Sequence, residues 1–388
     1  FSSSSQKKDN QAMTSDRTVK ANVVPPGSSA AHYAALDGLR AISVIIVMLA
    51  HAEFPYPRDG AVGVEIFFVL SGFLITGILS REFGKTGRID QKNFYMRRLL
   101  RLMPCLVLTL ILFSVFFVIR KHHFPTGIVA VCLTYTSNWA RPYWDLDGMA
   151  HSWSLGVEQQ YYLVWPFVIL LLERACRSNL VKFWSLACFA LSIALYRAAF
   201  VGTYSEARLY VGTDTHMDGL VLGSALSYLV ASLRESEHDF SRELRLVSRL
   251  IVPAAILGLL VIMYLIGGPW MGRLGYWLTA IAAFFIVGDL VLSPYSWMRR
   301  ALSWAPLVYL GTISYGLYLF HYPLYGIIDR YVRHVGYGPK LALKLSLCVL
   351  VAALSYHLVE VRFLRLKHLF GTSNKTKGST SQGSPVTI

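Results

Sequence analysis

Residues 96–119 read MRRLLRLMPCLVLTLILFSVFFVI, and this stretch decides the fold. From Leu102 onward nearly every side chain is apolar. At a rise of about 1.5 Å per residue, a helix over 102–119 is about 27 Å long, close to the thickness of the hydrocarbon core of a membrane. The stretch therefore predicts a transmembrane helix that begins beside a group of arginines.

The same pattern recurs along the whole chain of 388 residues. Hydrophobic residues make up 54% of it and charged residues only 15%, whereas a soluble domain carries about 25% charged residues. The other apolar segments lie near residues 36–52, 62–80, 127–137, 155–172, 183–201, 217–232, 250–267, 274–292, 306–328 and 341–360. Together these segments predict an all-α, polytopic integral membrane protein, and they exclude a soluble enzyme.

The segment near 127–137 is too short to cross a membrane as a helix, and we interpret it as re-entrant or interfacial. About ten transmembrane helices remain. With that number of crossings, most of the 37 Lys and Arg residues fall on the same side as the N-terminus. Because Lys and Arg concentrate in cytoplasmic loops, both termini are predicted to be cytoplasmic.

The two ends of the chain are polar and of low complexity, so residues 1–32 and 371–388 are predicted to be disordered tails. Between them, 33–370 form one transmembrane domain. The net charge of +15 is spread between the apolar segments and does not gather on one soluble module, which argues against a nucleic-acid partner. The five cysteines stand singly without metal-ligand spacing, so no metal site is predicted.

Titratable residues inside predicted spans are costly and often functional. The first span carries Asp37, Arg40 and His51 on one helical face, with Arg40 and His51 about 16 Å apart along the axis. An imidazole at this depth can accept and return a proton at neutral pH. The alternative is that His51 only ends the span at the membrane interface.

A second titratable cluster lies in HSWSLGVEQQYYLVWP, where His151, Ser154 and Glu158 share one helical face. The depth of Glu158 in its span is comparable to that of His51. Glu158 is therefore predicted to orient a catalytic imidazole or to bind a hydroxyl. A structural pairing with Arg197 or another buried cation is the alternative. The aromatic residues that follow are interpreted as interfacial or packing residues.

Arg97, Arg98 and Arg101 lie within one turn of each other at the start of the third span. Guanidinium groups bind phosphates in a fork geometry, so a nucleotide-bearing molecule suits this cluster. Ordinary flanking charge is the competing interpretation.

Two further motifs carry weaker signals. His321 in SYGLYLFHYP is either interfacial or catalytic. The acidic residues and His216 in TDTHMDG are interpreted as a solvated rim at the outer mouth of a span.

Taken in order, these motifs resemble the acyltransferase-3 family of polytopic membrane O-acyltransferases, which modify bacterial surface glycans and some secondary metabolites. The matching pieces are LDGLRAISVIIVMLAH, GAVGVEIFFVLSGFLIT, FYMRRLLRLMP, HSWSLGVEQQYYLVWP, TDTHMDGLVLG, LGTISYGLYLFHYPL and YHLVEVRFLR. Relatives commonly carry Arg where this chain has His216. No hydrolase-like segment follows the apolar core, so the chain resembles the stand-alone members.

The resemblance implies about ten transmembrane helices, a cytosolic acyl-CoA donor, an acceptor hydroxyl reached from the outer side and a multi-pass location in the bacterial inner or plasma membrane. The donor is taken as acetyl-CoA, and the acceptor as a hydroxyl of a glycan or glycosylated metabolite. The expected roles are catalysis by His51 and Glu158, donor binding by Arg40, Arg98, Arg101 and Arg97, and substrate binding by Asp37, Ser154, His151 and His321. His51 would act as a general base or as an acyl carrier.

An exporter that uses the same buried charges as a proton relay is the competing function. Many transporters contain inverted repeats, and inspection of the spans finds none in this sequence.

Overall fold

The structure is a computed structural model that describes residues 34–55, 60–265 and 270–370. Within these ranges the helices are joined by turns and loops, and the described β-structure is one isolated bridge between Val201 and Tyr204. The predicted all-helical membrane class is therefore confirmed. The predicted tails, 1–32 and 371–388, lie outside the described residues.

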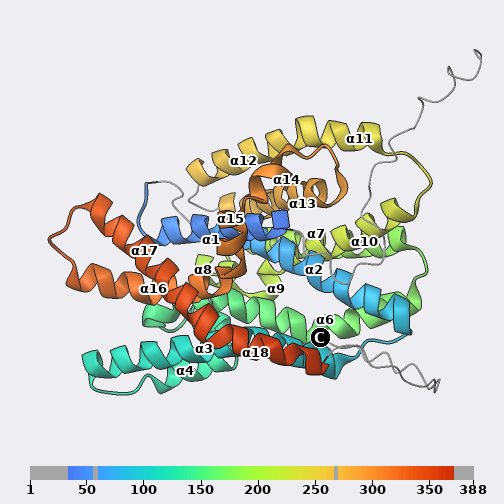
Figure 1. Cartoon of the computed structure of the whole chain (residues 1–388). Coiled ribbons are helices and arrows are strands. Elements are labelled where there is room, and N and C mark those ends of the chain that lie inside the picture. Colours follow the sequence, from blue (N-terminus) through green and yellow to red (C-terminus); the bar gives the residue numbers. More distant parts are fainter. Residues whose placement is uncertain (1–33, 56–59, 266–269, 371–388) are drawn as a thin grey trace, which may run out of the picture.

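The long helices run broadly side by side, with shorter helices joining their ends (Figure 1). The first half contains α1 (Ala34–His51), α2 (Ala61–Thr86), α3 (Gln91–Lys121), α4 (Thr126–Leu133), α5 (Ser137–Ala140), η1 (Asp147–Ser152), α6 (Trp153–Ala175), α7 (Asn179–Ala199), α8 (Glu206–Val211) and α9 (Thr213–His216). The second half contains α10 (Asp218–Glu235), α11 (Ser241–Leu246), η2 (Val247–Ile251), α12 (Val252–Leu265), η3 (Met271–Gly275), α13 (Tyr276–Leu292), α14 (Trp297–Leu302), α15 (Ala305–Thr312), α16 (Ser314–Tyr331), α17 (Tyr337–Ser355), η4 (Tyr356–Glu360), α18 (Val361–Arg365) and η5 (Leu366–Phe370).

Eight helical stretches of the described residues are long and apolar enough to cross a membrane. They are Ala34–His51, Ala61–Thr86, Gln91–Lys121, Asp147–Ala175, Asn179–Ala199, Ser241–Tyr264, Met271–Leu292 and Tyr337–Phe370. The prediction of about ten crossings with cytoplasmic termini goes beyond this number and stays a prediction.

The two other predicted spans are helical but differ from these eight. Segment 217–232 forms α10, which runs for 18 residues from Asp218 to Glu235 and carries charged residues at both ends. Segment 306–328 is divided at Ile313 into α15 and α16. Much of α10 and α16 is buried among other helices, so these segments need not be as apolar as a helix that faces lipid.

The segment predicted to be re-entrant or interfacial, 127–137, contains the eight-residue helix α4. A helix of this length spans about 12 Å, well short of the hydrocarbon core. α4 packs against α3, as Figure 1 also shows. The segment is therefore too short to cross as a helix, in agreement with the sequence.

α2 is the central helix, and it packs against α10, α1, α13 and α6. Two glycines let α2 and α10 approach closely. A Cβ atom added at Gly72 would lie 1.8 Å from the carbonyl oxygen of Leu220, and one added at Gly223 would lie 2.0 Å from that of Val69. Small residues at such crossings are typical of helix packing in membranes.

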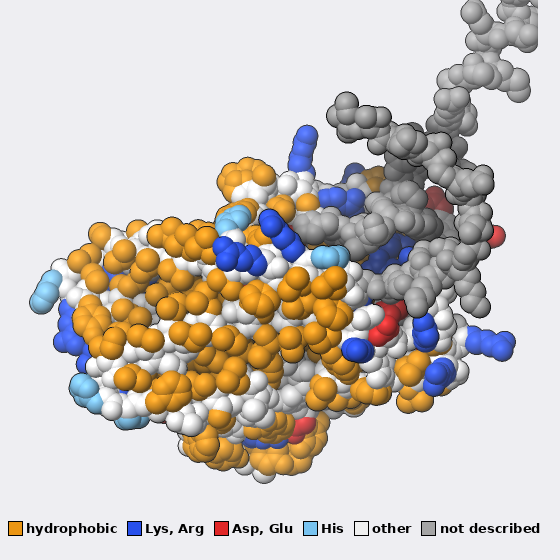
Figure 2. Space-filling view, turned by 60° about the horizontal axis from the view of Figure 1, so that its bottom comes forward, with side chains coloured by type: hydrophobic (Ala, Val, Ile, Leu, Met, Phe, Trp, Pro, Cys, Tyr) orange, Lys and Arg blue, Asp and Glu red, His pale blue; other side chains and the backbone are white. Residues whose placement is uncertain are grey.

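The outer surface is strongly apolar. Figure 2 shows a broad face covered mostly by hydrophobic side chains, with Lys and Arg side chains around its margins. Ile119, Leu163, Leu171 and Leu195 are each at least 60% exposed. Exposure on this scale is unfavourable in water but favourable in lipid, so the surface supports a multi-pass membrane protein.

A buried ion pair joins α7 to the start of α10. Arg197 and Asp218 are both fully buried, and their two hydrogen bonds measure 2.7 and 2.8 Å. The predicted solvated rim is therefore wrong for Asp218, which counters the charge of Arg197 inside the protein. The alternative that Arg197 pairs with Glu158 is also wrong, because Arg197 is held by Asp218.

Candidate active site

Two cavities adjoin at Val64 and Tyr318, which line both of them. The larger, the histidine pocket, has a volume of about 330 Å³ and is lined by His51, Gly60, Val64, Arg141, Ala150, His151, Trp153, Glu206, Ala207, Tyr210, Tyr276, Tyr318 and Tyr322. The smaller, the arginine cavity, has a volume of about 90 Å³ and is lined by Arg40, Val64, Phe67, Phe68, Ser71, Arg98, Arg101, Leu102, Ser154, Leu155, Glu158, Tyr162, Ser314, Tyr315 and Tyr318.

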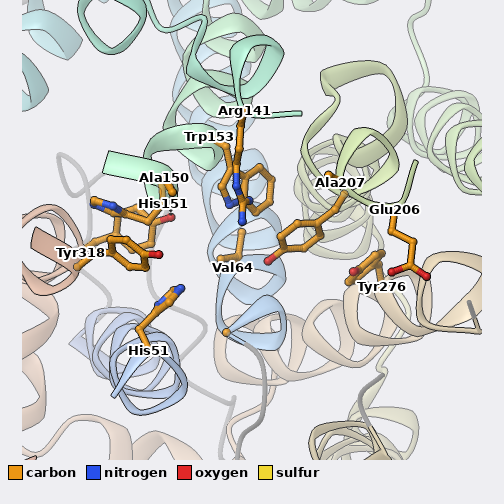
Figure 3. A pocket seen from close by; sticks show the side chains of 13 residues that line it. His51, Val64, Arg141, Ala150, His151, Trp153, Glu206, Ala207, Tyr276 and Tyr318 are labelled. Atoms are coloured by element: carbon orange, nitrogen blue, oxygen red, sulfur yellow. Dashed lines mark hydrogen bonds between the residues drawn. The ribbon is translucent and has the colours of Figure 1, made fainter. Parts of the chain in front are cut away.

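His51 is the last residue of α1, and its ring points into the histidine pocket (Figure 3). Its Nδ1 atom lies 3.0 Å from the carbonyl oxygen of Val47, one helical turn earlier. A carbonyl oxygen only accepts hydrogen bonds, so Nδ1 carries the hydrogen of the neutral ring. The other ring nitrogen, Nε2, then holds a lone pair, as a general base requires.

His321 of α16 supports the same tautomer. Its Nδ1 atom donates to the carbonyl oxygen of Tyr318 at 2.6 Å, which leaves Nε2 as an acceptor. That Nε2 atom lies 3.1 Å from Nδ1 of His51. The predicted substrate-binding residue His321 is fully buried behind His51 and is placed to orient its ring.

His151, from η1, is the third imidazole of this group. It lines the pocket, is 2% exposed, and its ring stacks on Tyr322 at a centroid distance of 5.3 Å. Its Nε2 atom lies 3.2 Å from the carbonyl oxygen of Leu319. Its Nδ1 atom is buried and has no hydrogen-bond partner among the described residues.

The arginine cavity receives Arg98 and Arg101 from α3 and Arg40 from α1. Arg40 forms a 3.2 Å ion pair with Asp37. Within the described part of the chain, Arg98 and Arg101 take part in no ion pair within 4 Å. The guanidinium of Arg98 lies instead over the rings of Phe94 and Tyr162, at 5.9 and 5.7 Å. Two positive groups at this cavity therefore lack a carboxylate partner, which favours an anionic ligand.

Two predicted site residues lie behind the cavity. Arg97 forms a 3.6 Å ion pair with Glu82 and donates to the carbonyl oxygen of Phe370 at 2.6 Å. Asp37 is buried against Arg40. Neither is among the described residues that line the arginine cavity; Asp37 pairs with an arginine that does, whereas Arg97 pairs with Glu82.

Glu158 lies in the arginine cavity, whereas His51 lies in the histidine pocket. The Glu158 carboxylate accepts hydrogen bonds from Ser71 and, at 2.6 Å, from Tyr162. Arg98 lines the same cavity. The structure thus groups Glu158 with the arginines, and it does not place this carboxylate in the imidazole pocket. Tyr162, interpreted from the sequence as a packing residue, is a hydrogen-bond donor to it.

Ser154 and Tyr318 connect the two cavities. The Tyr318 hydroxyl donates to the carbonyl oxygen of His151 at 2.8 Å. It therefore accepts the hydrogen of the Ser154 hydroxyl, whose oxygen lies 2.6 Å away. The sequence singled out Ser154 but not Tyr318, although Tyr318 lies one turn before His321 in the same motif.

His216 does not lie on a solvated rim either. It is fully buried, one ring nitrogen meets the carbonyl oxygen of Tyr210, and the other meets the carboxylate of Glu65. The rings of Trp153 and Tyr276 lie against it at centroid distances of 5.4 and 4.6 Å. His216 therefore supports the wall of the histidine pocket from behind, and an anionic substrate does not reach it.

The fold and cavities define a membrane protein in which a basic imidazole adjoins a cationic binding cavity. A family model described as an acyltransferase domain, the acyltransferase-3 model, matches residues 33–359. The chain belongs to this family.

Two relatives illustrate the match. One is named "Putative peptidoglycan O-acetyltransferase YrhL", from Bacillus subtilis, and is 31% identical over 347 residues, which cover 84% of this chain and 54% of that protein. The other is the O-acetyltransferase OatA of Staphylococcus aureus, 30% identical over 344 residues, which cover 84% of this chain and 56% of that protein. The chain thus spans about half the length of these relatives. No solved structure matches it.

Proposed function

We propose that this protein transfers an acetyl group from acetyl-CoA to a hydroxyl of a glycan or glycosylated metabolite at a bacterial cell membrane. The observation that carries the proposal is the adjoining pair of cavities, one with unpaired arginines and one with a histidine in the tautomer of a general base. The names of the relatives support O-acetyl transfer, and one of them names peptidoglycan.

The donor enters at the arginine cavity. Coenzyme A carries several phosphate charges, and guanidinium groups bind phosphate through paired hydrogen bonds. Arg98 and Arg101 bind these charges, with Arg40 deeper along the path. If Lys and Arg mark the cytoplasmic side, this cavity opens toward cytosolic acyl-CoA. The flexible arm of the donor then presents the thioester near Val64 and Tyr318, where the cavities meet.

The acceptor hydroxyl lies in the histidine pocket. The Nε2 atom of His51 takes the hydroxyl proton while the hydroxyl oxygen attacks the thioester carbonyl. The new ester bond forms, the bond between carbon and sulfur breaks, and the proton passes from His51 to the departing CoA sulfur. His321 holds the His51 ring in the required tautomer throughout.

The proposal is tested with purified protein in lipid vesicles, labelled acetyl-CoA and extracted bacterial glycan. The wild type is expected to place label on the glycan, and His51→Ala is expected to reduce transfer by about 100-fold or more, because general-base catalysis contributes at least this factor. The matched control is His123→Ala, an exposed histidine at the same end of the bundle. Transfer by His51→Ala at the wild-type rate, or export of glycan without label, would overturn the proposal.

A further inference from the structure

Arg141 is a pocket residue that the sequence did not single out. It follows directly after α5, and Figure 3 shows its side chain pointing into the histidine pocket. Its guanidinium carbon lies 5.9 Å from the ring centroid of Trp153 and 5.7 Å from that of Tyr210. These contacts hold a positive charge in place against two aromatic walls.

The described residues supply no carboxylate to neutralise Arg141. It forms no ion pair within 4 Å among them, and its Nη1 atom is buried without a hydrogen-bond partner. Two other arginines differ in this respect: Arg208 pairs with Asp214 at 2.8 Å, and Arg120 pairs with Asp147. Among the described residues that line the pocket, Glu206 carries the one carboxylate, and it lies apart from Arg141 in Figure 3. A buried donor without a partner is costly, so this arrangement favours an anionic ligand.

We propose that Arg141 binds an anionic group of the acceptor, so that the substrate class is an acidic sugar carrying a carboxylate or a phosphate ester. The inference rests on the proposed function for the identity of the pocket as the acceptor site. The guanidinium fork fits the planar or tetrahedral oxyanion, and the faces of Trp153, Tyr210 and Tyr276 pack against the sugar ring. The acceptor hydroxyl then lies on the His51 side of the pocket.

Binding is measured first, by saturation-transfer NMR on the full chain in lipid nanodiscs. The probes are methyl glucuronide, methyl glucoside 6-phosphate and the neutral methyl glucoside. The wild type is expected to bind at least one acidic probe about 10-fold or more tightly than the neutral one, because charge-assisted hydrogen bonds contribute on this scale. A preference for only one acidic probe identifies the anionic group as carboxylate or phosphate.

Arg141→Gln is expected to abolish this preference, and Arg141→Lys to restore part of it. Arg208→Gln, at an arginine paired with Asp214, is expected to keep it. Thermal unfolding of each variant shows whether the fold is intact. If Arg141→Gln is less stable than the wild type, Arg141→Lys, which keeps the positive charge, still tests whether that charge produces the preference for acidic probes. Equal binding of acidic and neutral probes, no binding of the acidic probes, or an unchanged preference in Arg141→Gln would contradict the inference.

Labelled acetyl-CoA separates this inference from the proposed function. In one outcome the acidic probes bind and their binding depends on Arg141, but no glycan receives an acetyl group. This outcome supports the anion site and rejects the transferase. The opposite outcome is acetyl transfer at equal rates to a native acidic glycan and to its carboxyl-reduced, dephosphorylated form, with the same rates in Arg141→Gln. This outcome supports the transferase and rejects the anion site.

Discussion

The arginines inside this bundle are held in two different ways. Arg197 is fully buried and holds both oxygens of Asp218. Arg98 and Arg101 line a cavity and have no carboxylate partner within 4 Å among the described residues. In a medium of low polarity, the first arrangement satisfies the charge internally, whereas the second leaves it available to a ligand. The comparison teaches that full burial goes with a carboxylate partner at Arg197, whereas the partly buried Arg98 and Arg101 line a cavity without one.

The largest expected effect comes from removing the partner of the paired arginine. Asp218→Ala leaves the charge of Arg197 buried and uncompensated, so we expect a loss of about 3–5 kcal/mol in the free energy of unfolding. Thermal or chemical unfolding in detergent measures it. The double variant Arg197→Met with Asp218→Leu removes both charges and is expected to recover most of the loss. An Asp218→Ala variant as stable as the wild type would erase the distinction between the two kinds of arginine.

The next effect falls on binding instead of stability. Arg98→Gln and Arg101→Gln are each expected to weaken acetyl-CoA binding by about 10-fold to 100-fold, the scale of a charged hydrogen bond. Neither removes an ion pair of the described structure, so the unfolding temperature is expected to stay near the wild-type value. Isothermal titration calorimetry with acetyl-CoA provides the affinity. If the variants are less stable than the wild type but bind acetyl-CoA with unchanged affinity, Arg98 and Arg101 have a structural role like that of Arg197.

A smaller effect is expected at His321, the neutral imidazole that lies against the ring of His51. His321→Ala removes one of the two acceptors near Nδ1 of His51, leaving the carbonyl oxygen of Val47, and is expected to lower kcat by about 10-fold, while KM for acetyl-CoA changes little. His321→Gln, which retains an acceptor oxygen, is expected to restore part of the rate. Steady-state kinetics with labelled acetyl-CoA measure both constants. A purely structural role would lower kcat equally in the two variants.

The smallest effect is expected at Arg97, next to Arg98 in sequence but paired with Glu82. Because the Arg97 side chain is 23% exposed and lies 3.6 Å from Glu82, we expect Arg97→Gln to cost about 1 kcal/mol or less in stability. Acetyl-CoA affinity is expected to remain within about threefold of the wild-type value, below the contribution of one charged hydrogen bond. A loss as large as in Arg98→Gln would show that Arg97 binds the donor directly.

The predictability of the site varies from residue to residue. His51, Arg98 and Arg101 were predicted because an imidazole or a cluster of arginines at a span is visible in a short window of sequence. Glu158 is predicted to orient an imidazole or to bind a hydroxyl; the structure places it in the arginine cavity, where its partner Ser71 comes from another helix, 87 residues away in the chain. Arg141 and Tyr318 were missed because a single arginine or tyrosine near the end of a span is common in membrane proteins.

The sequence by itself determined the membrane class, the helical architecture and the basic and titratable residues of the spans. These properties follow from local hydropathy, which a stretch of about 20 residues expresses in full. Only the tertiary structure decided which charges are neutralised, because the pairing groups are distant in the chain: His51 and His321 are separated by 270 residues, and Ser71 and Glu158 by 87. A charge inside a membrane acquires its role from the groups that packing brings next to it, and one-dimensional spacing does not report those groups.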